Sequence, residues 1–286
     1  MLKQRLITAV VLLLVLGAAM LAPARWPLLL ILIAASSLAS WEWLRLSLPP
    51  AQVFWAVPLA AGLAVFQGWL GYSSLYAENM LLPAQYLSFI YRYLTPLVIA
   101  FWLLLASYLV YRAQAERIEH SALLSLMGLL APLVAWAALL QMWLARGLLF
   151  VLSVLVLIWV ADISAYFVGR AVGGAKLAPR VSPGKTRSGA YGGIAGASLW
   201  VVLSTMWPNT LGSALLQQWS WLGLILITVL LAALSIMGDL FESLLKRRAG
   251  VKDSSQLLPG HGGVYDRIDA LLPVAPLVLV LSGLLG

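Results

Sequence analysis

The sequence predicts an all-α, polytopic integral membrane protein with about nine transmembrane helices and a cytoplasmic N-terminus. Of its 286 residues, 63% are hydrophobic and only 10% are charged, whereas a typical soluble domain is about 25% charged. The apolar runs are continuous, unlike the alternating strands of a membrane β-barrel. The basic residues, finally, gather on one side when the runs are counted as spans. This composition excludes a soluble enzyme, a disordered chain and a disulfide-rich secreted domain.

The apolar runs are each close to the length of about 20 residues that crosses a bilayer as a helix. They cover residues 6–22, 27–44, 53–71, 93–111, 121–143, 147–168, 190–207, 219–238 and 270–286. With the N-terminus in the cytoplasm, only Arg25, Arg92 and Arg146 of the 18 basic residues fall on the outer side. This asymmetry fits the positive-inside rule and sets the predicted orientation.

The first run has two interpretations. It begins with basic residues and ends near Ala22-Pro23-Ala24, as a cleaved signal peptide does. Its apolar stretch exceeds the 7–15 residues usual in a signal peptide, so a retained first helix is favoured. Trp26, Trp41 and Trp43 near the ends of the first runs are typical of interfacial anchors.

The two halves of the chain differ in their polar content, because the long polar loops lie in the second half. The fifth and sixth runs are joined by a very short turn at Arg146-Gly147, which predicts a tight hairpin. Beyond it lie two long, polar cytoplasmic loops, 169–189 and 239–269. We therefore expect residues 1–145 to be structural, lipid-facing helices and residues 146–286 to form the catalytic region.

Asp162 interrupts the sixth apolar run, about two turns before its cytoplasmic end. An ionisable residue inside a span usually faces a cavity or a partner. It is interpreted as a metal ligand or part of a polar cavity. The alternative is a packing carboxylate paired with Arg170.

Further carboxylates flank the loop 239–269. Asp239, Glu242, Ser243 and Lys246 share one face if the eighth helix continues past the membrane, where a solvated charged stripe is the alternative. Asp266 and Asp269, one turn apart, precede the ninth run, where simple helix capping is the alternative. Converging carboxylates repel one another unless a cation joins them, so these two clusters predict a divalent metal site.

The choice of metal follows from the donors available. There is no cysteine, and there are only two histidines, so any metal must be held mainly by oxygen ligands. That set suits Mg²⁺ or Mn²⁺, with phosphates completing the coordination.

Two loop segments have the composition of phosphate-binding sites. Ser182, Lys185 and Thr186 offer hydroxyls and an ammonium group to an oxyanion. The segment is not a Walker A motif, because Pro179 stands where a glycine is needed; an ordinary positive loop is the alternative. In 259–263, glycines on both sides of His261 permit positive φ and close approach to a ligand.

From Ser243 to Asp269 the chain reads S-L-L-K-R-R-A-G-V-K-D-S-S-Q-L-L-P-G-H-G-G-V-Y-D-R-I-D. This resembles the signature of the phosphatidate cytidylyltransferases, also called CDP-diacylglycerol synthases. The stretches G-D-L-F-E-S from Gly238, S-P-G-K-T from Ser182 and D-I-S-A-Y-F-V-G-R-A-V-G-G from Asp162 also resemble this family. The motifs cover about 162–269, and the first half matches only in being hydrophobic and multi-spanning.

The resemblance implies that CTP and phosphatidate, a membrane lipid, react to give CDP-diacylglycerol and pyrophosphate. It also implies Mg²⁺ or Mn²⁺ as the cofactor, no nucleic-acid partner, a possible homodimer, and a bacterial-type inner membrane with the active site facing the cytoplasm. The expected catalytic residues are Asp239, Asp266, Lys246, His261 and Arg267. The expected substrate-binding residues are Ser182, Lys185, Thr186, Ser243, Arg247, Lys252, Asp253, Gly262 and Gly263. The expected metal ligands are principally Asp239 and Asp266, then Glu242, Asp269 and Asp162.

Two other functions compete with this one. A related CTP-dependent polyprenol or phytol kinase, or another lipid cytidylyltransferase, uses the same kinds of residue. A cation transporter is the more remote alternative. It predicts charged residues deep in several spans, and only Asp162 meets that description.

Overall fold

The computed structural model describes residues 2–76, 80–113 and 121–285, with side chains from residue 7 onward. The predicted orientation also counted Lys3, Arg5 and Arg117 as cytoplasmic. The described part of the structure does not include Arg117 or the side chains of Lys3 and Arg5. The elements in chain order are α1 (Leu2–Leu21), α2 (Trp26–Ser47), η1 (Pro50–Trp55), α3 (Ala56–Tyr76), α4 (Leu81–Phe89), η2 (Ile90–Leu94), α5 (Thr95–Ala100), η3 (Phe101–Ala106), α6 (Ser107–Arg112), α7 (Ala122–Arg146), α8 (Leu148–Val172), β1 (Lys176–Ala178), β2 (Ser182–Thr186), α9 (Arg187–Ser204), α10 (Leu211–Gln218), α11 (Trp221–Arg248), α12 (Tyr265–Ile268) and α13 (Leu271–Leu281).

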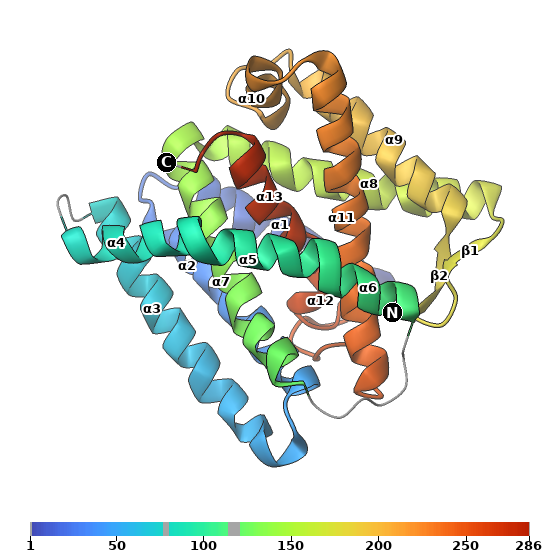
Figure 1. Ribbon diagram of the computed structural model, residues 1–286, viewed down its shortest axis with the longest axis horizontal. Helices are drawn as coiled ribbons and strands as arrows, with labels where there is room; N and C mark the ends of the chain where they lie inside the picture. The colour runs from blue at the N-terminus through green and yellow to red at the C-terminus, as the bar shows by residue number, and fades with distance from the viewer. Residues whose placement is uncertain (1, 77–79, 114–120, 286) are drawn as a thin grey trace. The chain divides into compact units, whose positions relative to one another are not determined.

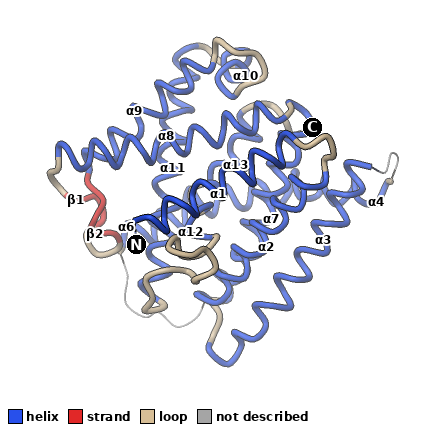
Figure 2. The backbone as a smooth tube through the Cα atoms, turned by 180° about the vertical axis from the view of Figure 1, so that it is seen from behind, coloured by secondary structure: helices blue, strands red, loops and turns tan. Residues whose placement is uncertain are grey.

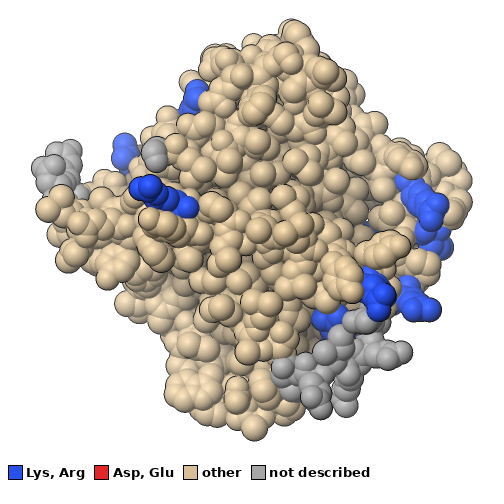
Figure 3. Space-filling view, viewed as in Figure 1, with Lys and Arg blue, Asp and Glu red and all other residues tan. Residues whose placement is uncertain are grey.

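Long apolar helices dominate the fold, which confirms a helical multi-pass membrane protein. Within the described residues, six helices are long and apolar enough to cross a bilayer: Trp26–Ser47, Pro50–Tyr76, Leu81–Arg112, Ala122–Arg146, Leu148–Val172 and Trp221–Arg248. Each contains or overlaps one of the predicted spans. On the face seen in Figure 3, the surface consists mostly of uncharged side chains, with Lys and Arg in a few places.

The other three predicted spans correspond to shorter or less apolar helices. The described side chains of α1 form a shorter apolar helix, Ile7–Leu21. Helix α9 covers part of 190–207 but is rich in glycine. Helix α13 has 11 residues and contains Pro276. The count of nine and the orientation of the N-terminus therefore stay predictions.

Two local features agree with the sequence. Helix α7 ends at Arg146 and α8 begins at Leu148, so the very short turn lies at Gly147, whose φ is +85°. A positive φ is unfavourable for residues with a Cβ, which accounts for glycine there. The packing of these two helices as a tight hairpin stays a prediction. Helix α11 continues past the apolar run to Arg248, as the common face of Asp239, Glu242 and Lys246 requires.

The chain packs as two compact units, which are described separately. The first contains Met1–Pro96, Glu116–Leu140 and Leu245–Ile268; the second contains Leu97–Ala115, Gln141–Leu244 and Asp269–Gly286. Each unit draws on both halves of the sequence. The functional division at residue 146 therefore stays a prediction.

The first unit is built around large aromatic side chains. Trp43 on α2 and Tyr265 on α12 are fully buried and stacked, with ring centroids 5.2 Å apart, so Trp43 packs in the core and is not the interfacial anchor that its position in the sequence suggested. A Cβ on Gly128 of α7 would lie only 2.8 Å from the Trp43 ring. Glycine at that position therefore lets α7 pack closely against the indole.

In the second unit, α8 and α9 run side by side (Figure 1). A row of glycines on α9 makes this approach possible. A Cβ on Gly193 would lie 2.9 Å from the Ala161 carbonyl oxygen, and one on Gly192 would lie 2.5 Å from the Val168 Cβ. Small residues at such spacing are typical of membrane helices whose backbones pack closely.

A short antiparallel hairpin, β1 and β2, connects α8 to α9 (Figure 2). Lys176 pairs with Thr186, and Ala178 pairs with Ser182. The sequence predicted helices and loops only, so this hairpin is an addition to the expected fold. It gives the segment 182–186 a defined extended backbone.

We expect Gly193→Ala to destabilise the second unit, because the added methyl meets the Ala161 carbonyl and the Ala165 Cβ, 3.2 Å away. Overpacking of this kind costs about 1–3 kcal/mol. Thermal unfolding of purified protein in detergent measures the effect.

The matched control is Gly62→Ala in α3, where a Cβ meets nothing within 4 Å. There, alanine favours the helix by up to about 1 kcal/mol. If both variants unfold at the same temperature, close α8–α9 packing is not what the glycine provides.

Candidate active site

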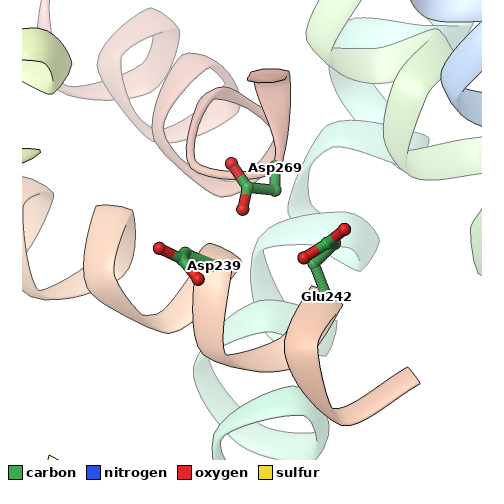
Figure 4. A group of neighbouring side chains, drawn as sticks. All are labelled: Asp239, Glu242 and Asp269. Carbon is green, nitrogen blue, oxygen red and sulfur yellow. The ribbon is translucent and has the colours of Figure 1, made fainter. Parts of the chain in front are cut away.

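Three carboxylates converge in the second unit. Asp239 and Glu242 extend from neighbouring turns of α11, and Asp269 comes from the segment between α12 and α13 (Figure 4). One ligand atom from each lies within 4.8 Å of the others. Glu242 and Asp269 are 1% and 8% exposed. We call Asp239, Glu242 and Asp269 the carboxylate triad.

Gly238 brings the two parts of the triad together. A Cβ at this position would meet the Asp269 carbonyl oxygen and would lie 3.0 Å from the Ala270 Cα. Only a glycine therefore lets α11 approach this backbone so closely. Asp269 Oδ1 also accepts a 2.7 Å hydrogen bond from the Ala270 N–H, which fixes its side chain.

Lys185 lies beside the triad. Its Nζ is 2.5 Å from Asp239 Oδ2, and the Ser243 hydroxyl lies 3.4 Å from Asp239 Oδ1. The extended strand β2 carries Lys185 to this position, with Ser182 at the start of the same strand. Two segments predicted separately, one for phosphate and one for metal, thus meet at Asp239.

The electrostatics of the triad favour a cation. Burial raises the pKa of Asp269 well above its usual range, and the charges of Asp239 and Asp162 raise it further. The charge of Lys185 and the Ala270 N–H act in the opposite direction. Three oxygen donors of this kind match the ligands that Mg²⁺ prefers. The residues therefore fit a divalent cation.

Asp162 and Thr186 have different surroundings from those expected. Asp162 lies on an exposed side of α8, outside the triad, and acts on Asp269 through its charge. The Thr186 hydroxyl is buried and accepts a 3.1 Å hydrogen bond from the Gly189 N–H, capping the start of α9. Thr186 therefore joins β2 to α9, which is a structural use of a residue expected to bind phosphate.

In the first unit, Asp266 is held by donors from residues 249–265, which follow α11 and which we call the signature loop. Its carboxylate accepts from Lys246 Nζ at 2.5 Å, from the Ser254 N–H at 3.0 Å and hydroxyl at 2.8 Å, and from the Gly263 N–H at 2.7 Å. Within the described residues, the group of three carboxylates that could hold one ion does not include Asp266. The geometry thus groups Glu242 and Asp269 with Asp239, where the sequence had favoured Asp266.

The turn 258–262 presents the histidine. The Leu258 N–H donates to the Gly262 carbonyl at 2.8 Å, and Gly260 and Gly262 have φ of +75° and +83°, as the glycine pattern predicted. Arg267 donates to the His261 carbonyl at 3.2 and 2.7 Å, so part of its guanidinium braces the turn. Arg247, Lys252 and Asp253 are exposed.

Sequence reasoning missed Glu42, on α2, which is 0% exposed. Its carboxylate accepts hydrogen bonds from Ser254, Ser255, Val264 and Tyr265 of the signature loop. The signal was present in the sequence, because Glu42 is an acidic residue inside the second apolar run. The rule that singled out Asp162 applies equally to it.

The chain is similar to a known family of proteins along nearly its whole length. The model of the "Cytidylyltransferase family" matches residues 3–285. A phosphatidate cytidylyltransferase of Pseudomonas aeruginosa is 43% identical over 98% of this chain and 97% of its own. That of Haemophilus influenzae is 36% identical over 96% of both, and that of Brucella abortus is 46% identical over 44% of both.

The family match extends over nearly the whole chain and includes the triad, the β-hairpin and the signature loop. The first two relatives cover both ends as well, so the likeness is not confined to the motifs. The chain is a multi-pass membrane protein that belongs to the cytidylyltransferase family.

Proposed function

We propose that this protein transfers CMP from CTP to phosphatidate, giving CDP-diacylglycerol and pyrophosphate for phospholipid synthesis. The observation that carries the proposal is the 43% identity, over 98% of the chain, to a relative named for this reaction. The site geometry supports it. Two anionic, phosphate-bearing substrates repel each other, and a divalent cation held by the carboxylate triad, together with Lys185, would offset that repulsion.

The triad is the proposed cation site, with Mg²⁺ or Mn²⁺ as the ion. Asp239, Glu242 and Asp269 would hold it, and bound metal supplies neutralisation of phosphate charge. Asp266 is proposed to orient Lys246, because its carboxylate contacts the Lys246 ammonium directly. Asp162 contributes negative charge near Asp269.

The basic residues neutralise the phosphates. Lys185, with Ser182 on the same strand, binds a phosphate beside the triad. Lys246, Arg247, Lys252 and Arg267 bind nucleotide or lipid phosphates. His261 donates to the pyrophosphate, while Gly262 and Gly263 let backbone approach the substrate and Asp253 orients Lys252.

The reaction needs little proton transfer. A phosphatidate phosphate oxygen attacks the α-phosphorus of CTP, the bond to the β-phosphate oxygen breaks, and pyrophosphate leaves. The attacking oxygen is already ionised near neutral pH, so no strong general base is required. Positioning and charge neutralisation therefore provide most of the catalysis.

The proposed location is a bacterial inner membrane, with the site facing the cytoplasm, where CTP is found. The bacterial relatives and the six apolar helices support this location. A homodimer is also proposed, on the family resemblance alone.

CTP labelled separately at the α- and γ-phosphates tests the reaction. With phosphatidate and Mg²⁺, we expect purified protein to transfer the α-label to lipid and to leave the γ-label in pyrophosphate. Appearance of the γ-label in a lipid would identify a kinase and overturn the proposal. Polyprenol in place of phosphatidate is the substrate control.

Substitution of the carboxylates distinguishes metal ligands from orienting residues. Asp239→Asn and Asp269→Asn each remove a charged oxygen donor, so activity should fall by about 100-fold or more and the Mg²⁺ concentration for half-maximal activity should rise. Asp266→Asn should lower activity without changing that concentration. A raised Mg²⁺ requirement in Asp266→Asn alone would return the ligand role to Asp266.

Lys185→Gln removes the ammonium beside Asp239 and should raise the KM for CTP or phosphatidate by about tenfold, the loss of one charge-assisted contact. The matched control is Lys176→Gln on β1, an exposed lysine of the same hairpin. Steady-state kinetics measure both. Equal KM values for the two variants would show that Lys185 acts only through the general charge of the hairpin.

A further inference from the structure

Glu42 lies outside every motif of the sequence, yet the structure links it to the signature loop. It is on α2, is fully buried, and has four hydrogen-bond donors around its carboxylate. Oε1 accepts from the Ser255 hydroxyl at 2.5 Å and the Val264 N–H at 3.0 Å. Oε2 accepts from the Ser254 hydroxyl at 2.9 Å and the Tyr265 N–H at 2.6 Å.

These four donors come from the two ends of one loop. Residues 254–255 precede the turn that carries His261, and residues 264–265 follow it. An ionised carboxylate offers about four acceptor positions. All of those of Glu42 face donors from the two ends of the loop, so this one side chain holds the two ends together. The stacking of Trp43 on Tyr265 adds a second contact between α2 and the same loop end.

Gly263 shows how closely the loop fits this carboxylate. A Cβ there would lie 2.5 Å from both Glu42 oxygens. The backbone φ of Gly263 is not positive, so the requirement for glycine is space, not conformation. The glycine is thus required by two side chains, Glu42 from more than two hundred residues earlier in the chain and Ser254 of the loop itself.

The same donors connect Glu42 to Asp266. The Ser254 hydroxyl lies 2.9 Å from Glu42 Oε2 and 2.8 Å from Asp266 Oδ2, and its single proton serves one carboxylate at a time. The Ser254 and Gly263 N–H groups, next to the donors of Glu42, bind Asp266. Asp266 in turn contacts Lys246.

We propose that Glu42 is a positioning residue for the transfer reaction: it holds the two ends of the signature loop and thereby sets Asp266 and Lys246. This inference rests on the proposed function. Glu42 is buried, so it acts through the loop and touches no substrate. The first half of the chain thus contributes to catalysis, beyond the structural, lipid-facing role expected for it.

Glu42→Gln is the sharpest test because it preserves size and removes two acceptor positions. Its amide NH₂ must face one serine hydroxyl and one backbone N–H. The hydroxyl can rotate and accept, but the backbone N–H cannot. At least one loop end is therefore released. Ser255→Ala removes a single donor to Glu42 and leaves every hydrogen bond of Asp266 in place.

The control is Ser36→Ala on the same helix. Ser36 is also buried, and its hydroxyl bonds the Pro132 carbonyl and the Gln67 amide, not the loop. It loses comparable buried hydrogen bonds without releasing either loop end.

In kinetics normalised to folded protein, we expect Glu42→Gln to lower kcat by about 10- to 100-fold, the usual effect of losing a hydrogen bond that orients a functional side chain. The KM for CTP and phosphatidate should change little. Ser255→Ala should show a smaller fall in kcat, and Ser36→Ala none. Wild-type kcat in Glu42→Gln, or an equal fall in Ser36→Ala, would overturn the proposal. If Glu42→Gln does not fold, the comparison of Ser255→Ala with Ser36→Ala decides.

A second readout does not depend on activity. The chain has no cysteine, so Leu258→Cys, half-buried in the turn, can be labelled selectively with a water-soluble maleimide. Labelling should be about tenfold faster when Glu42→Gln is added and unchanged when Ser36→Ala is added. Faster labelling with wild-type kcat would overturn the positioning role. A wild-type protein without CDP-diacylglycerol synthesis would instead refute the proposed function, while labelling would still test the loop contact.

Discussion

Buried carboxylates in a predominantly apolar chain must be compensated, and this constraint organises the structure. An ionised group removed from water is strongly unfavourable unless it is paired or hydrogen-bonded. The two units meet this requirement differently. In the second unit, Lys185 contacts Asp239 within a triad that suits a divalent cation. In the first unit, Glu42 and Asp266 are satisfied by loop N–H groups, serine hydroxyls and Lys246.

The carboxylate triad and the carboxylates of Glu42 and Asp266 are compensated in different ways, and this difference has a chemical consequence. A carboxylate whose acceptor positions are filled by the protein, as in Glu42, is suited to fixing backbone. Carboxylates that face one another, as in the triad, leave negative charge for a cation and its phosphates. Acidic residues that look equivalent in the sequence can therefore have different surroundings and different structural roles. Helix α11 supplies residues to both groups, with Asp239 and Glu242 in one and Lys246 in the other.

The glycines of this protein mainly allow backbone and side chains to approach closely where a Cβ would collide. Gly238 lets α11 reach the Asp269 backbone, Gly263 admits the Glu42 carboxylate, and Gly193 lets α9 lie against α8. Only some glycines, such as Gly147 and Gly262, have the positive φ that the turn pattern predicts. Close approach matters in a membrane protein because lipid is as apolar as the helices, so association relies on packing and hydrogen bonds.

The sequence by itself determined the helical membrane class, the turn at Gly147, the continuation of α11 and the family, because continuous apolar runs, turn glycines and contiguous motifs are local properties. It also brought Asp239, Glu242 and Asp269 into consideration together. Only the tertiary structure decided that Asp269 completes the triad while Asp266 binds the signature loop, that Thr186 caps α9, and that Glu42 binds both ends of the signature loop. Those outcomes depend on which backbone donors reach each side chain, and contacts between residues as distant as 42 and 265 leave no local pattern.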